Sequence, residues 1–138
     1  LLCAEFLPLI GEKAAKHPGL KLIVDHMGGA MRQKGKAASV HLPELVKLAK
    51  HPNIAVKATG GPGYAEDSYP FRSLEPWYKA IYDAFGPNRM FWGTDITRMP
   101  CAWKQCVTAI DESLPWLQGR DKELVMGRAV CDWIGWKV

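Results

Sequence analysis

Three short apolar runs recur along the chain at nearly constant spacing, and each follows a proline. The prolines are Pro18, Pro52 and Pro87, so the unit repeats about every 34 residues. Proline cannot continue a helix, and the glycine or asparagine that follows it accepts a turn conformation. Because the runs hardly alternate with polar residues, they are typical of parallel strands covered on both faces. The predicted strands are Leu20–His26, Ile54–Thr59 and Met90–Asp95.

Helical patterns fill the intervals between these runs. Leu42, Leu45 and Ala49 have the spacing of residues on one face of a helix. Helix and strand therefore alternate, which predicts βα units in a parallel sheet and so an α/β fold. The predicted helices are Leu42–Lys50, Leu74–Phe85 and a last region from Ala102 to Trp133.

The long loops follow the strands rather than the helices. Met27–His41 and Gly60–Arg72 follow the first two predicted strands, whereas the helix-to-strand turns are only about four residues long. In α/β folds, functional residues gather on the loops at the carboxyl ends of the strands. We therefore expect the functional site at those ends.

The composition fits one packed domain. The chain has 138 residues, of which 48% are hydrophobic and 23% charged, so it can bury a core. Its net charge of +4 is mild, and its basic cluster, Arg32–Lys36, contains a glycine and no aromatic residue. We interpret the cluster as a solvated loop and expect no nucleic-acid partner.

Cysteine spacing and hydropathy indicate the cellular compartment in which the protein is expected. The spacings of Cys3, Cys101, Cys106 and Cys131 fit neither a zinc knuckle nor a disulfide framework. No apolar run approaches the roughly 20 residues of a membrane span, and no signal-peptide pattern is present. We expect free thiols in a cytoplasmic protein with no membrane partner. The chain begins at Leu1, inside an apolar segment, so we expect a fragment of a longer protein.

One position of the repeat carries candidate chemistry. Eight residues after each proline stand His26, Gly60 and Asp95. If the strands lie side by side, His26 and Asp95 share one level, where a titratable pair suits metal ligation or acid–base catalysis. The alternatives are a helix cap for Asp95 and a structural role for His26. Strand alternation points Asp25 the other way, toward the helices, as a cap or hydrogen-bond partner.

Two basic residues are candidates for substrate binding. Lys57 lies inside a predicted strand, where it either keeps its ammonium group in solvent or faces a wet centre. In the second case it could meet a substrate carboxylate or Asp95. Arg98 follows Asp95 by three residues, and it either holds an anion from its loop or serves only at the surface.

The remaining candidates lie on the loops. Tyr64 is a further candidate for substrate binding, because with Tyr69 and Phe71 it forms an aromatic loop. That loop either covers a ligand or anchors itself. His41 stands at the start of a predicted helix, and we interpret it as a structural residue.

The three strand segments resemble a known family when taken together. LKLIVDHMGG, HPNIAVKATG and FGPNRMFWGTD are similar to strands six, seven and eight of the amidohydrolase-related family (the amidohydrolase 2 group). The closing KELVMGRAVCDWIGW resembles that family's last helix. Its members are (β/α)8 barrels. The resemblance implies that residues 1–138 are part of one such domain: the C-terminal half of a TIM-type barrel, from strand five or six to strand eight, with three or four parallel strands and flanking helices.

The resemblance also implies roles for two residues. Asp95 corresponds to an aspartate that binds a divalent metal ion and shuttles a proton in metal-dependent members, and that acts as the general base in metal-free lactonases. His26 corresponds to a histidine that polarises the substrate or assists the attacking water.

The implied metal is one divalent ion, Zn²⁺ or Mn²⁺. The family's first-strand H-x-H motif falls outside this chain, and no histidine occurs near LLCAEF, where a strand-five ligand would fall. One carboxylate and one histidine are too few for a closed zinc site. Either this subgroup lacks the metal, or further ligands precede Leu1 and Asp95 joins them.

The implied function is hydrolysis of a small organic acid, lactone or amide, with water activated by Asp95 with or without a metal. A decarboxylase of an aromatic or unsaturated acid on the same scaffold and an inactive structural fragment are the alternatives. Because half a barrel has open sheet edges, we expect the isolated fragment to be inactive and to dimerise or aggregate, and a homo-oligomer is a candidate assembly.

Overall fold

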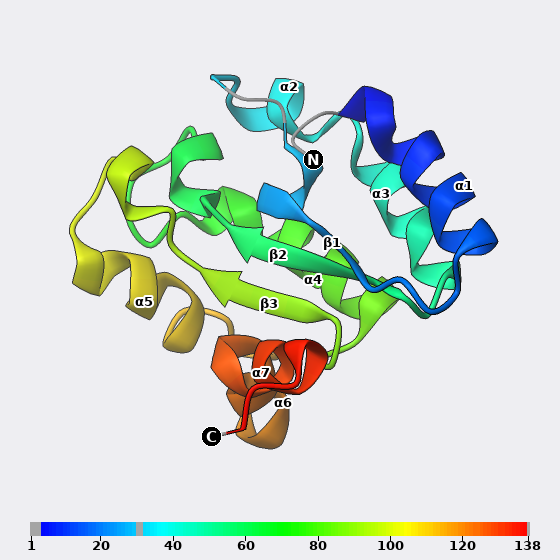
Figure 1. The fold of residues 1–138 in the computed structure, drawn as a ribbon. Helices are drawn as coiled ribbons and strands as arrows, with labels where there is room; N and C mark the ends of the chain where they lie inside the picture. The colour runs from blue at the N-terminus through cyan, green and yellow to red at the C-terminus, as the bar shows by residue number, and fades with distance from the viewer. Residues whose placement is uncertain (1–3, 30–31, 138) are drawn as a thin grey trace.

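Three parallel strands form the centre of the molecule (Figure 1). The computed structural model describes residues 4–29 and 32–137. The strands are β1 (Leu22–Val24), β2 (Ile54–Thr59) and β3 (Met90–Gly93). They lie in the order β1-β2-β3, and all pairs are parallel. The predicted α/β fold with parallel strands is therefore confirmed, whereas the apolar start of the chain and Cys3 lie outside the described residues.

The helices follow the predicted order with two additions and several breaks. Helix α1 (Leu7–Lys16) precedes β1, and α2 (Gly35–Ser39) lies within a segment expected to be a loop. A short 3₁₀ turn, η3 (Leu48–Lys50), continues α3 (Leu42–Lys47). The last predicted helical region is divided, since Pro115 cannot lie in a helix interior and Gly119 has a left-handed φ of 55°. A π-helical segment, η7 (Leu124–Arg128), follows α6. The α-helices among the described residues are α1 (Leu7–Lys16), α2 (Gly35–Ser39), α3 (Leu42–Lys47), α4 (Glu75–Phe85), α5 (Trp103–Asp111), α6 (Gly119–Glu123) and α7 (Ala129–Ile134).

Two side chains hold the short turns at the amino ends of the strands. The Asn53 amide donates to three backbone carbonyls between the last turn of α1 and the start of β1, at 2.9–3.1 Å. The Arg89 guanidinium donates to three carbonyls between Ala49 and Ile54, also at 2.9–3.1 Å. Buried carbonyls need such partners. These contacts fix the strands at one end and leave the long loops at the other.

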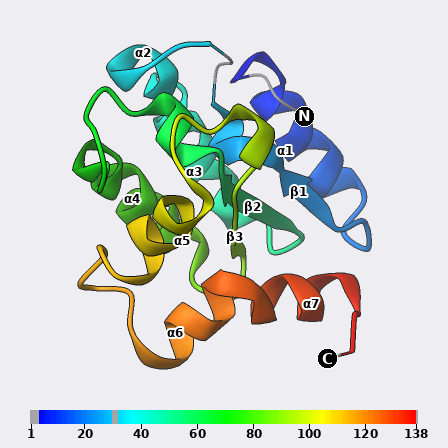
Figure 2. The same ribbon diagram turned by 90° about the vertical axis from the view of Figure 1, so that its left-hand side faces the viewer.

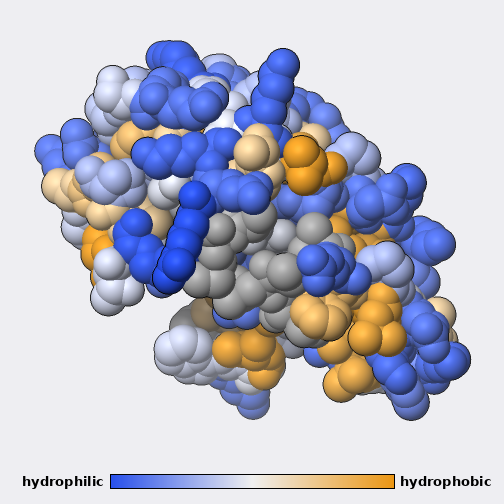
Figure 3. Space-filling view, turned by 90° about the horizontal axis from the view of Figure 1, so that it is seen from above, coloured by the Kyte–Doolittle hydropathy of each residue, from blue (hydrophilic) through white to orange (hydrophobic). Residues whose placement is uncertain are grey.

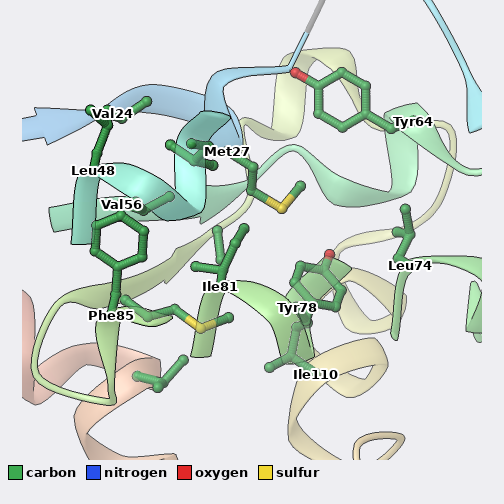
Figure 4. Packing of buried hydrophobic residues seen from close by; sticks show 14 of the residues in the cluster. Val24, Met27, Leu48, Val56, Tyr64, Leu74, Tyr78, Ile81, Phe85 and Ile110 are labelled. Atoms are coloured by element: carbon green, nitrogen blue, oxygen red, sulfur yellow. The ribbon is translucent and has the colours of Figure 1, made fainter. Parts of the chain in front are cut away.

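The larger core lies between the sheet and the helices that connect the strands. Val24 and Val56 pack there against Ile81 and Phe85 of α4, and Figure 4 shows these side chains together. All four side chains are almost fully buried. Burying a side chain of this size contributes about 1.5–3 kcal/mol, so this face of the sheet supplies most of the hydrophobic stabilisation.

A smaller core covers the opposite face of the sheet near its amino end. Ala55 and Phe91 pack there against Leu124 and Ala129. In the side view of Figure 2, α6 and α7 lie below the strands and α2 lies above them. This second face of the sheet is thus covered near the amino ends of the strands. Near their carboxyl ends it has space for polar side chains.

Polar side chains dominate the face of the molecule that is seen from above (Figure 3). Hydrophobic side chains form separate small groups on that face. Among the described residues, no helix combines the length and the apolar character needed to cross a membrane.

Candidate active site

Strands β1 and β3 each end two residues earlier than predicted, and left-handed residues follow shortly after each end. φ is 50° at His26, 56° at Met27 and 57° at Asp95. The left-handed conformation costs an L-residue about 1–2 kcal/mol. It also breaks the alternation of side chains that an extended strand imposes. Residues held in this way are concentrated at functional sites.

The side chains of His26 and Asp95 meet at the carboxyl edge of the sheet. The distance from His26 Nε2 to Asp95 Oδ2 is 3.6 Å, and the two side chains are 19% and 23% exposed. This distance is longer than a hydrogen bond, so each group can still bind a third molecule. Their matched positions in the repeat predicted this proximity.

Thr59, at the end of β2, orients His26. Its Oγ1 lies 2.7 Å from His26 Nδ1, so the other ring nitrogen, Nε2, faces the carboxylate. A Cβ atom on Gly93 would come within 2.7 Å of Thr59 Cγ2, so glycine in β3 leaves room for the threonine. Sequence reasoning matched Gly60 to the other strand ends and missed Thr59. Alternation from Lys57 places Thr59 on the same face and could have identified it.

A buried histidine supports the turn that carries His26. His41 is 5% exposed, and its Nε2 lies 2.7 Å from the backbone oxygen of Met27. A carbonyl oxygen only accepts hydrogen bonds, so Nε2 carries the proton and donates it. Gly28, with φ of 68°, gives the ring space, because a Cβ there would be 3.2 Å from His41 Cδ2. His41 is therefore a structural residue, as the sequence indicated, and it stabilises the left-handed turn beside His26.

Asp95 stands where a helix cap would stand, but it does not cap. It precedes the 3₁₀ turn η6 (Ile96–Arg98), and its carboxylate makes no capping hydrogen bond to the backbone. Its Oδ2 instead lies 3.2 Å from Arg98 Nη1. The cap interpretation is therefore wrong, and the structure brings Arg98 to the carboxylate as well as His26.

A cavity of about 170 Å³ opens beside Asp95, lined in part by Arg32, Arg98 and Tyr64. Burial raises the pKa of Tyr64, and Asp95 adds to this rise while Arg98 opposes it. The phenol therefore stays protonated at neutral pH and can donate a hydrogen bond. Arg32 of the basic cluster is exposed, as expected for a solvated loop residue, and it also lines this cavity. Its backbone is left-handed, with φ of 66°.

A second cavity, of about 400 Å³, shares Asp95 with the first cavity and is also lined by His26, Asp25 and Lys57. Lys57 Nζ lies 2.7 Å from Asp25 Oδ1. The prediction that Asp25 points toward the helices is wrong. Val24 pairs with Val56 in register, so the residues that follow them, Asp25 and Lys57, lie side by side on the site face.

The salt bridge favours the ionised form of Asp25. Burial raises the pKa of Asp25, but the hydrogen bond and the charge of Lys57 outweigh burial, and the net shift is downward. Lys57 faces the site, as one alternative expected, but its partner there is Asp25 rather than Asp95.

The residues of the aromatic loop have two different roles, and the sequence had left both open: anchoring the loop and facing a ligand. Tyr69 Oη lies 3.0 Å from Thr108 Oγ1 of α5, and its ring packs edge-on against Phe71 at 6.0 Å. These two residues anchor the loop. Tyr64 is 5% exposed and lines the smaller cavity.

The described part of the chain does not by itself fit a zinc site. It contains no group of three or more His, Cys, Asp or Glu side chains that could hold a metal ion. Asp95 and His26 supply at most two ligands, and catalytic zinc sites use three protein ligands. Asp95 could join a metal site only with ligands from outside these residues.

Comparison with known proteins identifies the family of the chain. The sequence matches the family described as amidohydrolase over residues 4–132. An L-fucono-1,5-lactonase from Burkholderia ambifaria is 30% identical over 95 residues, which are 69% of this chain and 32% of that protein.

Two solved structures share the fold. An amidohydrolase from Burkholderia multivorans, solved with bound zinc, superposes with a TM-score of 0.80 at 22% identity, covering 98% of this chain and 51% of that one. A protein from Pseudomonas putida designated a 2-pyrone-4,6-dicarboxylic acid hydrolase gives a TM-score of 0.70 at 20% identity, with 98% and 50% covered.

The chain thus spans about half the length of these solved relatives. Its three parallel strands and flanking helices correspond to half of a TIM-type (β/α)8 barrel. The family match covers nearly all of the chain, and the chain belongs to the amidohydrolase family.

Proposed function

We propose that this chain carries the acid–base groups of a hydrolase that opens the lactone of a small organic acid. The observation that carries the proposal is the convergence of Asp95 and His26, 3.6 Å apart at the carboxyl edge of a parallel sheet. Active sites of such barrels lie at this edge. Asp95 is the general base of the reaction, and His26 is its polarising partner.

The proposed reaction needs one proton to move twice. Asp95 accepts a proton from water while the water oxygen attacks the lactone carbonyl carbon. In this proposal the Thr59 hydroxyl, 2.7 Å from His26 Nδ1, is the donor of that hydrogen bond, which leaves the ring proton on Nε2. Nε2 then donates a hydrogen bond to the carbonyl oxygen as it gains charge. The ring C–O bond then breaks, and Asp95 returns the proton to the leaving oxygen. The product is a hydroxy acid, and the carboxylate is regenerated.

The charges around Asp95 suit an anionic substrate. Arg32, Arg98 and the protonated Tyr64 line the smaller cavity, and guanidinium groups bind carboxylates in a bidentate manner. Its volume of about 170 Å³ is below the roughly 300 Å³ of a complete ligand pocket, so it holds an acid group rather than a whole substrate. The larger cavity beyond Asp95 takes the ring, and Lys57 lies at its wall as a further candidate contact.

The relatives support the choice of a lactone. One is a lactonase, and another is designated a hydrolase of a pyrone, which is also a cyclic ester. A third binds zinc. A divalent metal, Zn²⁺ or Mn²⁺, would supply Lewis-acid activation of water, but the steps above use only groups of this chain.

The test is product identification with the protein encoded by the complete gene. We expect turnover of sugar-acid lactones or pyrone carboxylates, with one acid group released per ring opened and no CO₂. Release of CO₂ would instead indicate the decarboxylase. Release of an amine from amides alone, or no turnover of any lactone, would contradict the proposal.

A further inference from the structure

We propose that Cys101 and Cys106 form a dithiol modification site that a small-molecule disulfide, such as glutathione disulfide, converts to an intramolecular disulfide. The two Sγ atoms lie 3.5 Å apart, in contact through an S–H···S hydrogen bond. Both thiols are free in the structure. The proposal rests on this pair and does not depend on the proposed hydrolase function.

The start of helix α5 brings the two cysteines together. Ala102 is the N-cap residue, and its backbone N–H donates to Gln105 Oε1 at 3.2 Å. Cys101 therefore stands just before the cap, and Cys106 stands at the fourth helical position. These two positions are neighbours at a helix start and usually hold a hydrophobic contact. Here both carry sulfur, so the same contact can become a covalent bond.

The two thiols differ in access, as successive exchange steps require. Cys101 is partly exposed and lines a groove of about 590 Å³, together with Lys34, Tyr69 and Gln105. Cys106 is 3% exposed. A small disulfide can therefore reach Cys101 first, while Cys106 is protected and is placed to attack second.

The proposed oxidation consists of two successive thiol–disulfide exchanges. The Cys101 thiolate attacks glutathione disulfide, forming a mixed disulfide and releasing one glutathione thiolate. The Cys106 thiolate then attacks the Cys101 sulfur and displaces the second glutathione. The protein loses two protons and two electrons, and the oxidant takes up both electrons. The sulfur atoms must approach from 3.5 Å to about 2.05 Å.

Burial and the neighbouring thiol raise the pKa of Cys101. Only the thiolate attacks a disulfide, so the pair remains reduced for longer at neutral pH and reacts faster in mild alkali. The exchange is therefore best followed at about pH 8.5, where more of the thiol is ionised.

The bond would close beside the candidate active site. The segment from Ile96 to Cys101 links Asp95 to α5, and Met99 in that segment lines the smaller cavity. A disulfide would fix the end of this segment to the helix. It joins residues only five positions apart, so it constrains the local turn rather than the whole chain.

The experiment treats the native protein with glutathione disulfide at about pH 8.5 and maps the peptides by mass spectrometry. We expect a peptide containing both residues to become lighter by two hydrogen atoms, and dithiothreitol to reverse the change. The Cys106→Ser variant should stop at a glutathione adduct on Cys101. The Cys131→Ser control should form the link as the wild type does.

Three results would overturn the proposal. One is a pair that stays reduced while glutathione disulfide is in excess. Another is a separate glutathione adduct on Cys101 in the wild type, with no link to Cys106. The third is a link that forms only after urea denaturation. Circular dichroism on the same samples reports whether the protein remains folded.

Discussion

Thr59 is the residue on which the orientation of His26 depends, and Gly93 gives it space. The hydrogen bond to His26 Nδ1 leaves Nε2 toward Asp95. Glycine at position 93 has an ordinary backbone conformation, so its role is to keep a Cβ away from the threonine methyl. The site geometry thus depends on a contact between two neighbouring strands.

The Gly93→Ala substitution tests this contact. The added Cβ would lie 2.7 Å from Thr59 Cγ2, and we expect a loss of about 1–3 kcal/mol in the free energy of unfolding, as in overpacked cores. Thr59→Ser removes that methyl and keeps the hydroxyl. In the double variant we expect the Thr59→Ser change to recover at least about 0.5 kcal/mol in a double-mutant cycle, measured by urea unfolding.

A matched control separates the contact from a general glycine effect. A Cβ at Gly19 would meet no atom within 4 Å, so Gly19→Ala should change stability by less than about 0.5 kcal/mol. Additive effects of Gly93→Ala and Thr59→Ser would contradict the account of this contact.

His41 is the residue that stabilises the left-handed turn. His41→Ala removes a buried hydrogen-bond donor and leaves the Met27 carbonyl without its partner. We expect a loss of about 1–3 kcal/mol in the free energy of unfolding, measured by urea titration. His17→Ala, at an exposed histidine in a turn, is the control and should be nearly neutral. Equal effects of the two substitutions would argue against a specific role for His41.

At the scale of elements, the sequence predicted the strands and the middle helices but not where β1 and β3 end. Continuous apolar runs and proline punctuation predicted the observed bounds of β2, Ile54–Thr59. The ends of β1 and β3 depend on left-handed residues that are not glycine, and local propensity disfavours these. Tertiary contacts such as His41 with Met27 compensate their cost, and such contacts cannot be read from local spacing.

In the candidate site, too, the features that depend on strand register were predictable, and those that depend on left-handed residues were not. The repeat predicted that His26 and Asp95 lie at one level, which needs only strand register. The pairing of Asp25 with Lys57 depends on where β1 stops being extended, and Arg32 reaches the cavity through a left-handed loop residue. Neither feature has a periodic signal.

The salt bridge between Asp25, which follows β1, and Lys57 of β2 makes stability depend on pH. The pKa of Asp25 is lowered in the folded protein, so the ionised carboxylate stabilises the fold. This contribution is fully present above the ordinary aspartate pKa of about 4 and is lost as the pH falls through the lowered folded value.

We therefore expect wild type to be more stable than Asp25→Asn at neutral pH, with a difference that shrinks on acidification below about pH 4. Urea unfolding over this range measures it. Asp132→Asn, at an exposed carboxylate on α7, is the control. A difference that grows as the pH falls would contradict the direction assigned to Asp25.

At the scale of the whole molecule, the sheet has open edges. Within the described residues, β1 and β3 each pair on one side only. Unpaired strand edges are templates for association. The solved relatives are about twice as long as this chain, and their shared fold is a barrel in which such edges are paired.

We predict that the isolated 138-residue chain associates with itself through these edges and has no hydrolase activity. Sedimentation equilibrium should give an average mass that rises with protein concentration. A chain that remains monomeric at all concentrations and turns over a lactone would contradict this prediction.

Asp95 moves the proton in the proposed hydrolysis. The most direct test is kcat of Asp95→Asn for the best lactone substrate, in the protein encoded by the complete gene. Asparagine keeps the shape and cannot accept the proton, so we predict a fall of about 10²–10⁴-fold. Asp83→Asn, at an exposed carboxylate paired with Lys79 on α4, should leave kcat unchanged. Unchanged turnover by the folded Asp95→Asn protein would contradict the account.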